Sequence, residues 1–176
     1  MRSGEVRLRG GMATTEVAPG VMAPDRATVE AGDVSGYDVR IEVVLDGGRY
    51  IATAVHVLQR PGGPPVTGEA IRKVPVANII RRGLPMGVTW VASRSGGVTR
   101  STGAQMPENV TKYGPTDEAL TWVARVYRLA LLLDMPPTRE VETSLRLPRS
   151  TAGRWVAAAR DRGFLGTAEG PGKAGG

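Results

Sequence analysis

The stretch Pro148–Leu165 reads PRSTAGRWVAAARDRGFL and carries four arginines, one tryptophan and several alanines close to the C-terminus. Within it, Ala152, Val156 and Ala159 recur at three- and four-residue spacing, the period of a helix with one buried side. Pro148 suits the start of such a helix, and Gly163 suits its C-terminal end. The stretch therefore predicts a helix over 148–163 that buries small residues and turns arginines toward solvent.

Two further helices are predicted before this one. Apolar residues recur at helical spacing over 116–134, with Thr116 at a good N-cap position and acidic residues in the first turn. The MPP sequence at 135–137 ends that helix. We expect Thr138 to cap a short helix whose inner side includes Val141. The C-terminal third thus predicts an all-α bundle.

The segment 138–165, TREVETSLRLPRSTAGRWVAAARDRGFL, resembles the helix-turn-helix motif of small actinobacterial and phage-encoded DNA-binding regulators. The resemblance implies that the second helix enters the major groove, whose width of about 12 Å admits one helix. Two positions depart from the usual pattern. Glu142 stands where such motifs usually carry alanine, and Arg146 stands where the turn usually carries glycine. In a left-handed conformation Arg146 would cost about 1 kcal/mol; the alternative is a different turn.

Long hydrogen-bond donors surround small residues on the outward side of the predicted recognition helix. Arginine can read guanine edges or grip phosphates, and Ser150 can bond to a base or a phosphate. The small Gly153 and Ala157 let the helix backbone approach the DNA. The candidate DNA-binding residues are Arg139, Arg146, Arg149, Ser150, Thr151, Gly153 and Arg154.

Other residues of the segment have structural interpretations. Thr151 either reaches a phosphate or caps its own helix, and we favour the phosphate. Trp155 is expected to pack in the core, as tryptophan commonly does. Arg160 and Arg162 lie near the C-terminal end, where favourable interaction with the helix dipole is preferred over DNA contact.

The overall charge fits a nucleic-acid partner. The chain has 176 residues, a net charge of +6 and a sequence pI of about 10.3. Such a value raises the expectation of an anionic partner. An arginine-, glycine-, alanine- and proline-rich composition is equally typical of a GC-rich genome, so charge alone does not decide the function.

The N-terminal half predicts a small α+β unit. YDVRIEVVL at 37–45 alternates apolar and polar residues, the glycines at 47–48 predict a tight turn, and RYIATAVHVL at 49–58 returns as a second strand. A helix capped by Thr67, a second helical piece from Pro75 and a third strand within 87–93 follow. The predicted fold class is α+β: an N-terminal β-hairpin/helix unit plus a C-terminal all-α helix-turn-helix bundle.

The predicted boundaries are as follows. We expect a disordered segment over 1–35, the small α+β domain over 36–93, a linker over 94–115, the helix-turn-helix domain over 116–165 and a disordered tail over 166–176.

Several function classes are disfavoured. The chain has no cysteine, so it forms no disulfide and offers no thiolate ligand. His56 is the only histidine, and the glycine pairs lack nucleotide-binding context. We therefore expect no enzyme activity, cofactor or metal. No apolar run approaches the ~20 residues of a membrane helix, and the N-terminus lacks a secretory signal. A cytoplasmic, nucleoid-associated protein is expected.

The leading hypothesis is a sequence-specific regulator of transcription that binds double-stranded DNA as a homodimer. The N-terminal unit would dimerise or bind a protein partner. The alternative is a non-catalytic adaptor or assembly protein of a phage or mobile element, with the bundle serving protein contacts or non-specific DNA handling. A third reading is that the hairpin–helix unit senses a small ligand.

Overall fold

The predicted hairpin forms one edge of an antiparallel sheet. In the computed structural model, which describes residues 4–94, 97–101 and 106–166, its strands are β5 (Tyr37–Asp46) and β6 (Arg49–Gln59). Gly47 and Gly48 have positive φ angles of 54° and 75°, which glycine adopts without steric conflict. Buried residues alternate with exposed ones along the middle of β5, at Val39, Ile41 and Val43. The hairpin prediction is confirmed.

The N-terminal segment is folded, which corrects the prediction that residues 1–35 are disordered. It contains β1 (Val6–Arg9), β2 (Ala13–Ala18), β3 (Val21–Pro24) and β4 (Arg26–Val34). β4 pairs antiparallel with β1 and β5, giving the order β1-β4-β5-β6. The buried side of β4 includes Ala27, Val29 and Ala31. The period-two signal was therefore present, but alanine carries it weakly because it favours strands little.

The predicted helices of the N-terminal half are also present. The Thr67 hydroxyl accepts a bond from the Ala70 N–H at 3.2 Å and caps α1 (Gly68–Arg72). Pro75 then precedes α2 (Val76–Gly83). The second helical piece predicted from Pro75 is thus present.

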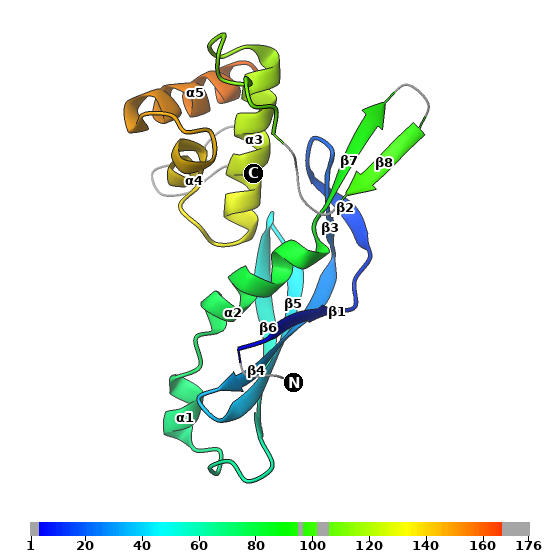
Figure 1. Cartoon of the computed structure of the whole chain (residues 1–176), viewed down its shortest axis with the longest axis vertical. Helices are drawn as coiled ribbons and strands as arrows, with labels where there is room; N and C mark the ends of the chain where they lie inside the picture. The colour runs from blue at the N-terminus through cyan, green and yellow to red at the C-terminus, as the bar shows by residue number, and fades with distance from the viewer. Residues whose placement is uncertain (1–3, 95–96, 102–105, 167–176) are drawn as a thin grey trace. The chain divides into compact units, whose positions relative to one another are not determined.

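Helix α2 and the 3-10 turn η1 (Leu84–Gly87) pack against the sheet at β4 and β1 (Figure 1). Gly83 makes this close approach possible. A Cβ atom at Gly83 would lie 2.4 Å from the Cγ1 atom of Val29 and 3.2 Å from that of Val6. Any side chain at residue 83 would push the helix away from the sheet.

A second antiparallel sheet has the order β2-β3-β7-β8. Its β7 (Thr89–Arg94) confirms the strand predicted within 87–93, and β8 (Gly97–Ser101) pairs with it. The expected linker over 94–115 is thus partly a strand, and it also supplies Val110 to the helical core. The prediction of a linker or a long ordered loop is therefore wrong for residues 97–101, which form a strand. The described residues 106–115 contain no helix or strand, as the prediction requires. The tail predicted over 166–176 lies, apart from Gly166, outside the described residues.

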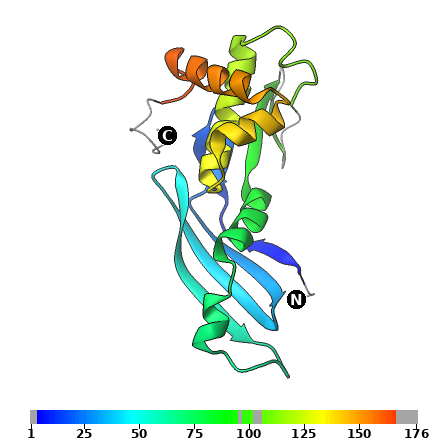
Figure 2. The ribbon, with the colours of Figure 1, turned by 90° about the vertical axis from the view of Figure 1, so that its left-hand side faces the viewer.

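The C-terminal part is a bundle of α3 (Asp117–Leu132), α4 (Pro137–Ser144) and α5 (Arg149–Asp161). All three helices pack on one another, and α5 crosses α3 at a large angle (Figures 1 and 2). The Thr116 hydroxyl accepts from the Ala119 N–H at 3.3 Å, as the capping prediction requires. Thr138 is not a cap, because α4 already begins at Pro137 and its N-cap residue, Pro136, has no capping side chain.

The α+β fold class is confirmed, with antiparallel sheets followed by a helical bundle. The chain divides into two compact units whose boundaries differ from the predicted ones. One comprises Met1–Thr15, Ala23–Asp46 and Tyr50–Val88; the other comprises Glu16–Met22, Gly47–Arg49 and Thr89–Gly176. N-terminal strands contribute to both units, which local sequence patterns could not indicate.

Candidate nucleic-acid interface

The connection between α4 and α5 is a tight turn built on a left-handed residue. Arg146 has a φ angle of +53°. Its N–H donates to the Thr143 carbonyl at 3.3 Å, and the Leu147 N–H donates to the Glu142 carbonyl at 3.0 Å. These two bonds are those of a Schellman motif, which usually has glycine at the left-handed position. Of the two alternatives from the sequence, the structure has the left-handed arginine.

Helix α5 has a buried side and an exposed side. Ala152, Trp155, Val156 and Ala159 belong to the hydrophobic core of the bundle. Trp155 has 7% of its surface exposed, which confirms that it is a packing residue. The opposite side exposes Arg149, Ser150, Arg154 and Ala157. Gly153 lies half-buried among them, and a Cβ atom there would meet nothing within 4 Å.

The four candidate arginines are available for a ligand. Arg139 on α4, Arg146 in the turn, and Arg149 and Arg154 on α5 are all exposed. Within the described part of the chain, none of them takes part in an ion pair. Their charges are therefore uncompensated by neighbouring carboxylates, and each guanidinium retains most of its donors.

Thr151 does not cap its helix. Pro148 is the N-cap residue of α5, and no side chain bonds there. Instead, the half-buried Thr151 hydroxyl accepts a bond from Arg154 Nη2 at 3.2 Å. This contact orients the Arg154 side chain along the helix. The phosphate contact of Thr151 stays a prediction.

Arg160 and Arg162 hold the bundle together. Arg160 Nη2 donates to the Tyr127 hydroxyl at 2.6 Å, with the guanidinium 5.0 Å from the centre of the Tyr127 ring. Arg162 donates to the Pro115 carbonyl at 2.8 Å and forms an ion pair with Asp117. Both side chains thus have specific partners at or before α3. Because the partners of Arg160 and Arg162 lie far away in the sequence, the sequence pattern did not predict these contacts.

Glu142 is tolerated because it lies beside the helix contact and not within it. The inner side of α4 is formed by Val141 and then Leu145, with 0% and 2% of their surfaces exposed. Glu142 is half-buried and, among the described residues, has no ion pair with an arginine. A glutamate at this position could turn outward or pair with an arginine, and the described residues show no such pair.

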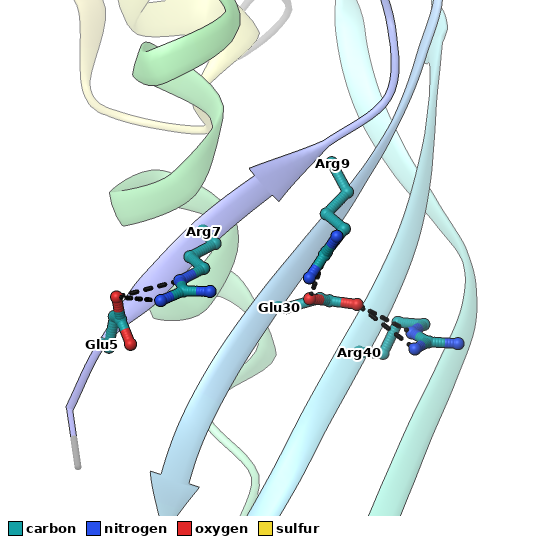
Figure 3. A network of polar contacts seen from close by, with 5 residues as sticks. All are labelled: Glu5, Arg7, Arg9, Glu30 and Arg40. Carbon is teal, nitrogen blue, oxygen red and sulfur yellow. Dashed lines mark hydrogen bonds and ion pairs between the residues drawn. The ribbon is translucent and has the colours of Figure 1, made fainter. Parts of the chain in front are cut away.

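A second group of charged residues ties together three strands of the first sheet (Figure 3). Glu30 on β4 accepts from Arg9 on β1 at 2.8 Å and from Arg40 on β5 at 3.2 Å. The bond from Arg9 is the main cause that holds the pKa of Glu30 below its ordinary value. Beside it, Arg7 donates to Glu5 at 2.7 Å. Only the register of the strands brings these residues together, so sequence patterns did not reveal them.

His56, the only histidine of the chain, has a carboxylate as its neighbour. His56 lies on β6 and contacts the Glu42 carboxylate at 3.2 Å. Among the described residues, no three histidine, cysteine, aspartate or glutamate side chains gather as metal ligands would. In the same residues, every helix is too short or too polar to span a lipid bilayer.

No family model, curated protein or solved structure matches this chain.

Proposed function

We propose that the protein is a sequence-specific DNA-binding protein, a regulator of transcription, that reads the major groove with α5. One observation carries the proposal: the exposed side of α5 combines Arg149 and Arg154, which form no ion pair with any described residue, with a small centre at Gly153. Long cationic side chains can reach base edges and phosphates while the helix backbone sits deep in the groove.

The surrounding elements fit the same role. Arg139 on α4 and Arg146 in the turn before α5 are also exposed, and the proposal assigns phosphate contacts to them. Because α5 is anchored by its buried side on α3 and α4, its exposed side is held in a fixed orientation. Binding of bacterial DNA places the protein at the nucleoid, and it requires no catalysis or cofactor.

The test is fluorescence anisotropy with labelled genomic fragments, first selected for binding from a genomic pool. Arg149→Ala and Arg154→Ala are each expected to weaken binding by about 10- to 100-fold, the value of a base contact. Arg81→Ala is the matched control, since it removes an exposed arginine from α2. Tight binding that is indifferent to both α5 substitutions would remove this helix from the mechanism.

Bulk competitor DNA separates specific from non-specific binding. A specific protein keeps its selected fragment in the presence of excess unrelated DNA, whereas a non-specific one loses it. Loss of all binding under competitor would favour the alternative of non-specific DNA handling by an assembly protein.

A further inference from the structure

Strand β6 is an open edge of the first sheet. It lies at the end of the order β1-β4-β5-β6, and within the described residues no other strand pairs with its outer side (Figure 2). β6 is 11 residues long and contains no proline. A long edge of this kind presents free N–H and C=O groups that can pair with another strand.

The opposite edge of the same sheet is protected. β1 is only four residues long, and its Arg7 and Arg9 side chains are 50% and 65% exposed. Short length and charged side chains are the usual devices that prevent pairing at an edge. β6 is long, and its one arginine is its first residue, Arg49, so most of this edge carries neither form of protection.

Most of β6 carries no charged side chain, which favours an uncharged partner strand. Between Tyr50 and Leu58 there is no lysine, arginine, aspartate or glutamate, although the chain as a whole has a net charge of +6. Ile51, Val55 and Leu58 are large apolar residues with 48%, 41% and 48% of their surfaces exposed. A partner strand must therefore be neutral and apolar to match this edge. The strand itself has these properties.

We propose that β6 pairs antiparallel with β6 of a second copy, so that one continuous sheet crosses the two-fold axis of a homodimer. In a two-fold arrangement the same patch faces itself. Full overlap of the two strands places Ala54 opposite Ala54 of the partner subunit. Ile51 then faces Val57 of the partner subunit, and Thr53 faces its Val55. Arg49 faces the partner's Gln59, so no like charges oppose each other.

The inference depends on strand β6 and is independent of DNA binding. A dimer formed in this way also supplies the two copies of the helix-turn-helix that paired half-sites require.

Analytical ultracentrifugation of the full chain provides the first test. The wild-type protein is expected to sediment as a dimer at micromolar concentration without DNA. Val55→Lys is expected to yield monomer, because two lysines would approach each other near the axis. Ala77→Lys, on an exposed position of α2, is the matched control and should remain dimeric. Circular dichroism checks that each variant is folded.

Cross-linking tests the register and does not depend on the folding of the lysine variant. Because the chain has no cysteine, Ala54→Cys introduces a single thiol. Directly opposite residues have Cβ atoms about 4.5–5.5 Å apart, so a short bifunctional thiol reagent should link the two copies efficiently. Ala77→Cys should remain unlinked.

A wild-type monomer, a dimer unaffected by Val55→Lys, or equal cross-linking of both cysteine variants would overturn the proposal. A monomeric wild type would leave the edge open to a peptide of another protein. None of these outcomes depends on Arg149→Ala or Arg154→Ala, so the dimer and the DNA-binding proposal can fail separately.

Discussion

Replacing Gly153 with alanine is expected to stabilise the bundle while weakening DNA binding. Glycine inside a helix is less favourable than alanine by about 0.5–1 kcal/mol, mainly because glycine loses more conformational freedom on folding. A Cβ atom at Gly153 would meet nothing within 4 Å, so no steric clash reduces this gain in stability. The free energy of unfolding should therefore rise by about 0.5–1 kcal/mol, measured by urea denaturation.

The effect on DNA has the opposite sign because Gly153 lies at the centre of the exposed side. In the proposed complex, alanine would move the helix backbone slightly away from the groove, and Gly153→Leu would move it further. We expect the leucine variant to lose about 10-fold or more in affinity, the value of at least one displaced base contact. Ala77→Leu adds comparable bulk to α2 as a control. Unchanged binding by a folded Gly153→Leu variant would refute a deeply seated α5.

Three further predictions concern stability. Arg146→Gly removes the cost of a left-handed arginine, so the free energy of unfolding in urea should rise by about 0.5–1 kcal/mol. The same change should lower the salt dependence of DNA binding by the equivalent of about one phosphate contact. Glu30→Gln replaces the carboxylate that accepts from Arg9 with a neutral amide and should destabilise by about 1 kcal/mol at neutral pH. Gly83→Ala places a Cβ atom 2.4 Å from Val29 and should destabilise by about 1–3 kcal/mol, seen as a lower melting temperature.

The Glu30 prediction has a specific pH dependence. The pKa of Glu30 is lower in the folded state than its ordinary value of 4.5. Its contribution is therefore fully present above pH 4.5 and disappears as the pH falls through the lower folded value. The wild type and Glu30→Gln should converge in stability in acid. A stability difference that stays constant with pH would contradict the ion-pair interpretation of Glu30. An unchanged melting temperature of Gly83→Ala would contradict the predicted clash with Val29. Lower stability of Arg146→Gly would contradict the predicted relief of the left-handed conformation.

Local patterns predicted the elements whose signals lie within a few residues. The hairpin at Gly47–Gly48 and the helix starting after Thr116 both follow from adjacent residues, and both are present. The period of 3.6 residues was enough to separate Trp155 from Arg154, so the exposed side of α5 could be assigned from the sequence.

The features that sequence reasoning missed depend on distant residues. Strand β4 pairs with β1 through small residues such as Ala31, whose weak strand preference hides the pattern. Arg160 and Arg162 find their partners 33 and 45 residues away, at Tyr127 and Asp117. Such contacts are set by packing in three dimensions, and no local rule indicates which arginines are bound within the protein.

The contacts of Arg162 with Pro115 and Asp117 also have a consequence at high salt. They join the end of α5 to the start of α3. The Arg162 and Asp117 side chains are 47% and 73% exposed, so their attraction is screened by dissolved ions. Rising ionic strength should therefore loosen this junction while the buried packing of α5 on α3 persists.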